Sequence, residues 1–531
     1  IAVCPAAAAD VSFRIRMIIK HPLSDPPARR LMPLALLLIA ASHLAAQPVV
    51  KADAIPGTGH GTAHQALASL NRDITTILSD RSFADATWGV SVISCDNGES
   101  LYALNERRNR QAASNIKLLT TAAVLQNLGG GYRFTTELRA GGDIGPNGEL
   151  GGDLVIRTSG DPSISPSFGN DPRELIREWG RKLDSLGIRS VQNIVVDASY
   201  FDDIPYGPGW AWDDESYGFN TPISAAAIYD NSIQVTVTPG KTPNAPVSID
   251  ISPSTAYVTL EVMAVTSRPD SASTIDIRRE RGGRTIVVHG NIAAGAEPYV
   301  EHVSVENPPL FFATIVREEL ERNGIVVHGS VHAAAEYRGG LSYGALRPVA
   351  EHQSIPLREI VAATNKQSLN LSAEMLAKKL GRDFGGTGST AAGVEVVKRL
   401  LTLAGIDIEH VRLYDGSGLS RQDMIAPADI TALLRWAQRS HIAEDYLASL
   451  AIAGRDGTLA NRLKGTLAEN NAIGKTGFLG GIRALSGYVR TRDGELLSFS
   501  IIANNYSVPT SVVNTAQDLM VMRLASFSRK N

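Results

Sequence analysis

The chain has 531 residues, of which 44% are hydrophobic and 20% are charged, and this composition is sufficient for more than one buried core. Its 51 basic and 54 acidic residues leave a formal net charge of -3. Because no long run of one sign occurs, the charge pattern argues against a nucleic-acid-binding stripe and against a charged membrane patch.

Residues 1–46 have the pattern of an upstream region followed by a secretory signal peptide. A pair of arginines precedes an apolar run that ends in small residues near Ala46, which is the order of segments in a signal peptide. A transmembrane anchor is the weaker interpretation, because Ser42 interrupts the run and a spanning helix needs about 18 apolar residues or more. We expect export to the periplasm or another extracytoplasmic compartment, with no transmembrane anchor, and a linker over residues 47–64.

Residues 65–140 are expected to form the first part of a catalytic domain. The stretch "AHQALASLNRDITTIL" has apolar residues at helical spacing, and two alternating runs follow it around Asp96-Asn97-Gly98, which is a strong hairpin signal. The next stretch, "QAASNIKLLTTAAVLQNLGGG", predicts a helix that begins near Ser114 and ends at its three glycines.

The middle of the chain, residues 141–347, has a different hydrophobic pattern from both ends. Short alternating runs such as "NSIQVTVTPG" and "GRTIVVHGNI", separated by turns, predict β-rich domains that contain one or two helices, "DPRELIREWGRKLDSLG" being the clearest.

In residues 348–531, helical spacing returns in "LREIVAATNKQSLNLSAEMLAKKLG" and "AAGVEVVKRLLTLAG", and strands and a last helix follow. The predicted fold class is α+β, with one domain of helices around an antiparallel sheet that is interrupted by a β-rich insertion.

Ser114 and Lys117 are the first candidates for catalysis. Residues at i and i+3 share one face of a helix, so the hydroxyl and the amine can lie within reach of each other. A serine needs a base to act as a nucleophile, and a lysine kept neutral by desolvation can serve as that base. The alternative is a helix-capping serine followed by a solvated lysine, since serine is a favoured N-cap residue. No other lysine of the chain has a serine three residues before it.

A second polar motif, Ser368-Leu369-Asn370, lies in the second helical region. Its hydroxyl and amide are suited to relaying a proton and to holding a substrate amide. Ser69-Leu70-Asn71 repeats the pattern, but it lies inside the first predicted helix and precedes Ser114, so we discount it.

The third motif, Lys475-Thr476-Gly477, begins a predicted strand. Lys475 supplies charge and Thr476 a hydroxyl for a carboxylate, while Gly477 permits a close approach of backbone and substrate. The same residues could end a phosphate-binding loop. That motif needs a glycine where Glu469 stands, and a helix where a strand is predicted, so we reject it.

In this order the three motifs resemble the signature of penicillin-binding proteins and serine β-lactamases. The long interval between the first and second motifs is similar to that in the D-alanyl-D-alanine carboxypeptidase/endopeptidase family of class C low-molecular-mass penicillin-binding proteins, peptidase family S13. The stretches "SGDPSIS", "GWAWDDESYGFNTPISA", "DGSGLSR" and "GRDGTLANRL" extend the resemblance over about residues 65–525. The resemblance implies a penicillin-binding-protein/β-lactamase-like transpeptidase domain that is interrupted by inserted β-rich domains.

The resemblance also implies a role for each catalytic residue in acyl transfer. Ser114 would attack the carbonyl of the penultimate D-Ala, with Lys117 as the base. Ser368 would pass a proton to the leaving amine, Asn370 would orient the acyl chain, and Lys475 would lie beside Ser368.

Thr476, Gly477 and Phe478 are the substrate-binding residues that the resemblance implies. The family usually has Thr or Ser after Lys-Thr-Gly, and its hydroxyl helps to hold the terminal carboxylate of the substrate. Here that residue is Phe478. We therefore expect weaker recognition of the carboxylate, whereas the N–H groups of Ser114 and Phe478 can still form the oxyanion hole.

The implied partners are peptidoglycan stem peptides as substrates and β-lactam antibiotics as covalent inhibitors. No cofactor and no metal are expected, because the sequence has neither an H-E-x-x-H motif nor a cysteine cluster. The alternatives are a serine β-lactamase, which needs rapid deacylation, and a catalytically weak cell-wall-binding or scaffolding protein, which Phe478 leaves open. The sequence does not distinguish carboxypeptidase from endopeptidase activity, and it does not identify the diamino acid of the substrate.

Overall fold

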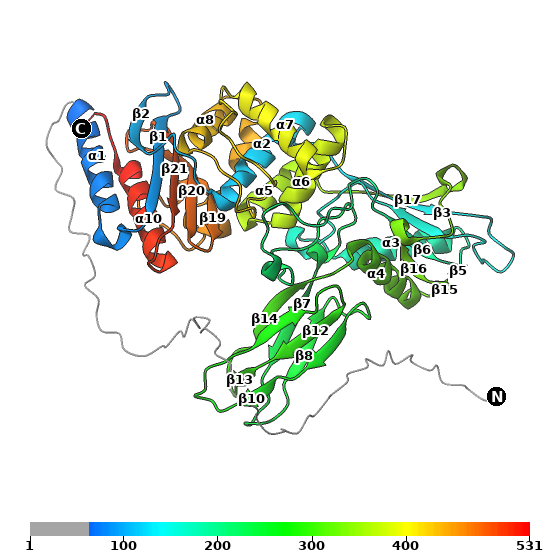
Figure 1. Ribbon diagram of the computed structural model, residues 1–531. Coiled ribbons are helices and arrows are strands. Elements are labelled where there is room, and N and C mark those ends of the chain that lie inside the picture. Colours follow the sequence, from blue (N-terminus) through cyan, green and yellow to red (C-terminus); the bar gives the residue numbers. More distant parts are fainter. Residues whose placement is uncertain (1–62, 531) are drawn as a thin grey trace.

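The computed structural model describes residues 63–530 of the chain. The predicted signal peptide and nearly all of the predicted linker lie outside these residues. Within them, no helix combines the length and the apolar character that crossing a bilayer requires. Figure 1 shows a sheet with helices on both sides at one end of the molecule, and two further groups of strands beyond these helices.

A six-stranded antiparallel sheet brings the two ends of the described chain together. Its strand order is β18-β19-β20-β21-β1-β2. Strand β1 pairs with β21 along its whole length, from Thr87 opposite Asn504 to Ser94 opposite Leu497, so the predicted hairpin lies in one sheet with the closing strands. The strands are β1 (Thr87–Ser94), β2 (Ser100–Leu104), β18 (Ala451–Ile452), β19 (Ile473–Leu479), β20 (Ile482–Arg490) and β21 (Leu496–Asn504).

Helices cover both faces of this sheet, and alternate residues of its strands enter two separate cores. In β20, Ala484 and Tyr488 pack into the core shared with α2, whereas Leu485 and Val489 pack into the core shared with α1 and α10. One face carries α1 (Ala63–Leu78) and α10 (Thr510–Ser526) (Figure 1). The opposite face carries α2 (Ile116–Leu128), α5 (Leu357–Gln367), α6 (Asn370–Phe384), α7 (Thr390–Leu403), α8 (Pro427–Gln438) and α9 (Ala443–Ala448).

The middle of the chain has a third core of its own. A five-stranded sheet has the order β16-β6-β4-β3-β17, and α3 and α4 pack with it. Its strands are β3 (Thr135–Ala140), β4 (Leu154–Arg157), β6 (Ile194–Asp197), β16 (Val331–Ala333) and β17 (Arg347–Gln353). The helices are α3 (Pro172–Ser185) and α4 (Pro308–Arg322), and a small pair of strands is β5 (Ser190–Val191) and β15 (Val326–Val327).

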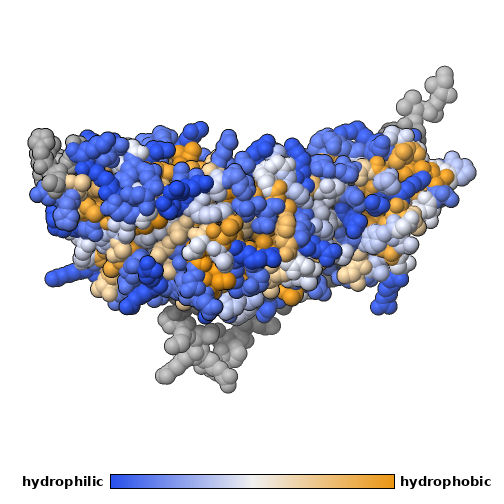
Figure 2. Space-filling model, turned by 90° about the horizontal axis from the view of Figure 1, so that it is seen from above, coloured by the Kyte–Doolittle hydropathy of each residue, from blue (hydrophilic) through white to orange (hydrophobic). Residues whose placement is uncertain are grey.

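The remaining strands form two three-stranded sheets and one pair, with the orders β14-β7-β8, β11-β12-β9 and β10-β13. They are β7 (Ser232–Thr238), β8 (Ser248–Ser252), β9 (Thr259–Val262), β10 (Val265–Ser267), β11 (Asp276–Arg279), β12 (Thr285–His289), β13 (Asn291–Ala293) and β14 (Tyr299–Ser304). From above, the molecule is elongated, and apolar side chains are scattered among hydrophilic ones on this face (Figure 2).

Strand pairing suggests where the insertion begins and ends. Strands β3 and β17 pair with each other, so both lie in the five-stranded sheet. Leu138 and Val349 are buried in the core of the middle region and not in the cores beside the six-stranded sheet. We propose that the chain leaves the catalytic domain just before β3 and returns to it just after β17, a few residues outside the limits of 141 and 347 that the sequence pattern suggests.

Candidate active site

Ser114 lies in a short 3-10 helix, η2 (Ala113–Asn115), immediately before α2. Ala113 has a φ of 46°, a left-handed conformation that is unfavourable for a residue with a Cβ. Two glycines pack against this segment: a Cβ on Gly418 would lie 2.0 Å from the carbonyl oxygen of Ala113, and one on Gly477 would lie 2.5 Å from that of Ala112. The backbone at Gly418 and Gly477 therefore holds the segment that carries Ser114, and a residue with a Cβ could not come so close at either position.

Lys117 lies one turn after Ser114 and is completely shielded from solvent. Its Nζ donates hydrogen bonds to Oγ of Ser114 at 3.0 Å, to Oδ1 of Asn370 at 2.6 Å and to the carbonyl oxygen of Ser417 at 2.7 Å. This geometry overturns the alternative of a solvated lysine. Burial lowers the pKa of Lys117 to about 7, although the negative charges of Asp415 and Glu374 raise it in part.

A buried loop holds the carbonyl group of Ser417 against Lys117. Glu374 on α6 accepts the backbone N–H groups of Gly416 and Ser417 through one carboxylate oxygen, at 3.0 and 2.7 Å. Asp415 accepts three backbone N–H groups of the same loop and the indole N–H of Trp210. Burial, followed by the charge of Asp415, raises the pKa of Glu374 to about 8. The acids thus fix the loop and also favour the charged form of Lys117.

Ser368 occupies a sharp turn between two helices. It is the C-cap residue of α5 and has a φ of 65°, and α6 begins two residues later at Asn370. Oγ of Ser368 accepts a hydrogen bond from Nζ of Lys475 at 2.9 Å, while Asn370 lies against Lys117. The two polar residues of this motif therefore form hydrogen bonds with different lysines, Ser368 with Lys475 and Asn370 with Lys117.

The inserted region reaches the site at Asn370. The amide nitrogen Nδ2 of Asn370 donates to the carbonyl oxygen of Phe219 at 2.8 Å. The ring of Phe219 stacks on that of Tyr217 with a centroid separation of 5.6 Å. Together with the bond from Trp210 to Asp415 at 2.9 Å, this contact makes residues 210–219 one wall of the site.

Lys475, Thr476 and Gly477 lie in the middle of β19. Lys475 is fully buried, and its pKa is lowered well below the usual value by burial and then by the positive charges of Lys117 and Arg483. Oγ1 of Thr476 donates to Oγ1 of Thr458 at 2.8 Å, in the short helix η8 (Gly457–Leu459). The prediction of a strand at this motif is confirmed, although the strand begins two residues before Lys475, at Ile473. The structure adds a packing reason for Gly477, which lies against η2.

Phe478 follows this motif at the surface, where 55% of its side chain is exposed. It stands opposite Arg483 of β20, whose guanidinium carbon lies 5.5 Å from the centre of the Phe478 ring. The three motifs thus lie around one site: Ser114, Lys117 and Asn370 form one connected group, and Ser368 and Lys475 form a second.

Sequence reasoning gave no role to Glu374, Asp415, Thr458, Phe219 or Arg483. Three of these belong to stretches that were noted for their resemblance alone: Asp415 to "DGSGLSR", Thr458 to "GRDGTLANRL" and Phe219 to "GWAWDDESYGFNTPISA". A signal therefore existed for them. Glu374 and Arg483 have no local signal, because their importance depends on what the fold places beside them.

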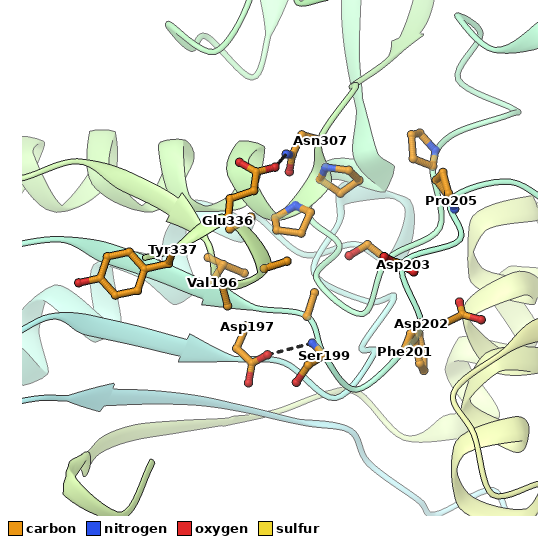
Figure 3. Close-up of a pocket in the computed structure, with 18 of the residues that line it drawn as sticks. Val196, Asp197, Ser199, Phe201, Asp202, Asp203, Pro205, Asn307, Glu336 and Tyr337 are labelled. Carbon is orange, nitrogen blue, oxygen red and sulfur yellow. Dashed lines mark hydrogen bonds between the residues drawn. The ribbon is translucent and has the colours of Figure 1, made fainter. Parts of the chain in front are cut away.

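A separate cavity of about 800 Å³ lies at the end of strand β6, beside the loop that follows this strand and contacts α6 (Figure 3). Asp197, Asp203 and Glu336 are among its lining residues, and Asp202 at its edge is paired with Lys378 of α6. Of the described residues around it, none belongs to the three motifs. We therefore do not assign the motif chemistry to this cavity.

Comparison with known proteins gives consistent matches. Residues 70–527 match the family described as the D-Ala-D-Ala carboxypeptidase 3 (S13) family. The D-alanyl-D-alanine carboxypeptidase of Actinomadura sp. (strain R39) is 34% identical over 476 residues, which cover 87% of this chain and 85% of that protein. The D-alanyl-D-alanine carboxypeptidase DacB of Haemophilus influenzae is 28% identical over 404 residues, which cover 75% of this chain and 81% of the relative.

A solved structure gives the same result for the fold. The crystal structure of penicillin binding protein 4 (dacB) from Haemophilus influenzae has a TM-score of 0.74 at 25% identity, and the match covers 86% of this chain and 99% of that chain. This similarity confirms the predicted α+β fold.

Proposed function

Because this chain belongs to the D-Ala-D-Ala carboxypeptidase 3 (S13) family and is a serine-type, penicillin-binding carboxypeptidase, we propose a role for each residue of its three motifs. The observation that carries the proposal is the environment of Lys117. Its amine is buried, and it lies between Ser114, Asn370 and the carbonyl group of Ser417.

Lys117 is the general base in this proposal. A neutral amine has two N–H groups and one lone pair. The N–H groups donate to Oδ1 of Asn370 and to the carbonyl oxygen of Ser417, at 2.6 and 2.7 Å, so the lone pair is left for the hydroxyl of Ser114 at 3.0 Å. Asn370 and Ser417 thereby orient the base, and burial keeps much of it neutral near pH 7.

Acylation then transfers two protons, one from Ser114 to Lys117 and one from Ser368 to the leaving amine. Oγ of Ser114 bonds to the carbonyl carbon of the penultimate D-Ala while its proton passes to Lys117. The backbone N–H groups of Ser114 and Phe478 stabilise the oxyanion. As the C–N bond breaks, Ser368 gives its proton to the leaving amine, and the ammonium group of Lys475 replaces that proton.

Deacylation reverses these transfers. A water molecule attacks the ester carbonyl and loses a proton through Ser368 to Lys475. Oγ of Ser114 leaves with the proton that Lys117 holds. Both lysines then return to their starting protonation states, so the proton transfers balance without a cofactor.

The substrate we propose is the D-Ala-D-Ala end of peptidoglycan stem peptides, with endopeptidase action on cross-links as a second reaction at the same residues. The names of the Actinomadura and Haemophilus relatives support the carboxypeptidase activity. A Haemophilus penicillin binding protein 4 structure contains a β-lactam, which supports covalent inhibition by such compounds. This substrate requires an extracytoplasmic location, in agreement with the predicted signal peptide.

Digestion of defined muropeptides tests the function. Purified protein is incubated with a pentapeptide monomer and with a cross-linked dimer, and the products are identified by mass spectrometry. We expect release of D-Ala from the monomer, and cleavage of the dimer identifies endopeptidase activity. A protein that cleaves neither muropeptide and instead hydrolyses penicillin with rapid turnover would be a β-lactamase.

A further inference from the structure

Arg483 is a cation beside the Lys-Thr-Gly strand that sequence reasoning left without a role. It lies near the beginning of β20, and its register partner on β19 is Phe478. Residues that face each other across two paired strands point to the same side of the sheet. Arg483, Phe478 and Thr476 therefore share one side, which is the side of α10 and opposite to that of Lys475.

The hydrogen bonds of Arg483 fix its position and leave its charge uncompensated. Its Nε donates to Oδ1 of Asn514 on α10 at 2.5 Å. The nearby acid Asp518 is engaged by Arg462, at 2.8 Å. Within residues 63–530, Arg483 has no ion pair, and neither of its Nη atoms has a hydrogen-bond partner.

A partly buried guanidinium without an acidic partner is unfavourable, because desolvation penalises the charged form. The pKa of Arg483 is accordingly lowered to about 10 by burial and by the neighbouring charge of Arg462. The ring of Phe478 compensates in part, since a cation is attracted to an aromatic face. The two free Nη groups form one edge of the guanidinium, and this edge matches the geometry of a carboxylate.

The edge of β19 is where a substrate carboxylate would arrive. Strand β18 pairs only with Ile473 and Gly474, so among the described strands none covers the outer edge of β19 beyond them. An extended peptide can add to such an edge as a further strand. Neighbouring strands are about 4.8 Å apart, a distance that an arginine side chain on β20 can span across β19.

We propose that Arg483 binds the terminal carboxylate of the substrate and supplies the recognition that the missing hydroxyl at position 478 does not. The guanidinium of Arg483 packs against the ring of Phe478, and Thr476, whose hydroxyl donates to Thr458 in this structure, lies on the same side of the sheet. The inference rests on the proposed function of the same site, and it identifies Arg483 as a determinant of specificity for substrates with a free carboxylate.

The test compares two peptides that differ in one group: one ends in D-Ala-D-Ala with a free carboxylate, and the other ends in the corresponding amide. For Arg483→Met we expect kcat/KM to fall about tenfold or more with the carboxylate peptide, and to change less than about twofold with the amide. Arg483→Lys retains the charge and should recover part of the activity on the carboxylate peptide. An equal loss with both peptides would overturn the proposal, because it would indicate a structural role or an effect through Lys475.

A matched control is Arg490→Met, which removes the same charge from the exposed end of the same strand. It should change neither peptide reaction. Acylation by benzylpenicillin and by its methyl ester gives the same comparison without peptide hydrolysis. Failure to hydrolyse either peptide therefore overturns the proposed function, while the ratio of the two acylation rates still decides the role of Arg483.

Phe478→Thr provides a second, independent test. The added hydroxyl should raise kcat/KM for the carboxylate peptide by about tenfold in the Arg483→Met background, because there it replaces a missing donor. In the presence of Arg483 the gain should be much smaller. Equal gains in both backgrounds would show that the two residues act independently, which contradicts the proposal.

Discussion

Nζ of Lys117 lies 3.0 Å from Oγ of Ser114, and the lysine side chain is completely excluded from water. A charged amine in this position is costly, so burial lowers its pKa to about 7. The neutral fraction of Lys117 consequently increases as the pH rises through about 7. The same burial that makes the lysine a base also sets the pH range in which it works.

The first prediction is that acylation of Ser114 by a penicillin accelerates between about pH 5.5 and pH 8.5, with a midpoint near 7. Stopped-flow measurement of the acylation rate over this range gives the midpoint directly. Lys117→Met should lower the rate by about two to four orders of magnitude without lowering the melting temperature, because an apolar chain of similar length replaces a buried amine. A rate that does not depend on pH, or a fully active Lys117→Met variant, would require a different base.

The second prediction concerns Glu374, whose negative charge raises the pKa of Lys117. Glu374→Gln preserves an oxygen that can accept the N–H groups of Gly416 and Ser417, but it removes the charge. Because the pKa of Glu374 is about 8, most of its charge is absent below pH 7, so Glu374→Gln should lower the pKa of Lys117 only slightly and move the acylation profile to lower pH mainly above pH 7. The same stopped-flow titration measures this shift, and a shift to higher pH would contradict the electrostatic role given to Glu374.

The third prediction separates two buried acids of one loop. Asp415 accepts four hydrogen bonds, and an asparagine would present N–H groups to some of these donors. We expect Asp415→Asn to lower the free energy of unfolding by about 3 kcal/mol. Burial raises the pKa of Asp423 well above its ordinary value, and among the described residues its carboxylate accepts the backbone N–H of Tyr414 alone, so Asp423→Asn should cost less than about 1 kcal/mol. Urea unfolding of both variants measures the difference, and equal costs would contradict the larger hydrogen-bonding role given to Asp415.

The fourth prediction uses the close packing of the nucleophile segment. A Cβ on Gly477 would lie 2.5 Å from the carbonyl oxygen of Ala112. Gly477→Ala should therefore displace the segment before Ser114, lower the free energy of unfolding by about 1–3 kcal/mol and slow acylation at least about tenfold.

Gly480 provides the matched control at the end of the same hairpin. A Cβ there would have only Arg421 within 4 Å, at an ordinary contact distance of 3.5 Å. Gly480→Ala should change the free energy of unfolding by less than about 0.5 kcal/mol and leave acylation unchanged. If both alanine variants acylate at the normal rate, the position of Ser114 does not depend on the backbone contact at Gly477.

The sequence predicted the elements and residues whose signals are local. The Ser114 and Lys117 pair, the hairpin at Asp96-Asn97-Gly98 and the strand that carries Lys475 are each specified within a few residues. The turn at Ser368 was not predicted, because apolar residues continue at helical spacing on both sides of it and a single left-handed residue interrupts the helix.

Other features depend on partners that are far apart in the chain. Phe219 contacts Asn370 across 151 positions, and Thr87 pairs with Asn504 across most of the chain. The pairing of Phe478 with Arg483 depends on the register of two strands, since a shift by one residue would place Arg483 on the opposite side of the sheet. Such contacts cannot be read from periodicity, which specifies a face but not its neighbour.

Mass spectrometry of penicillin-treated protein tests the assignment of Ser114 most directly. The wild-type protein should gain the mass of one penicillin, and peptide mapping should locate it on Ser114. Ser114→Ala, with a melting temperature close to that of the wild type, should gain no mass. A covalent adduct on Ser114→Ala, or an adduct mapped to Ser368 in the wild type, would contradict the assignment of Ser114 as the nucleophile.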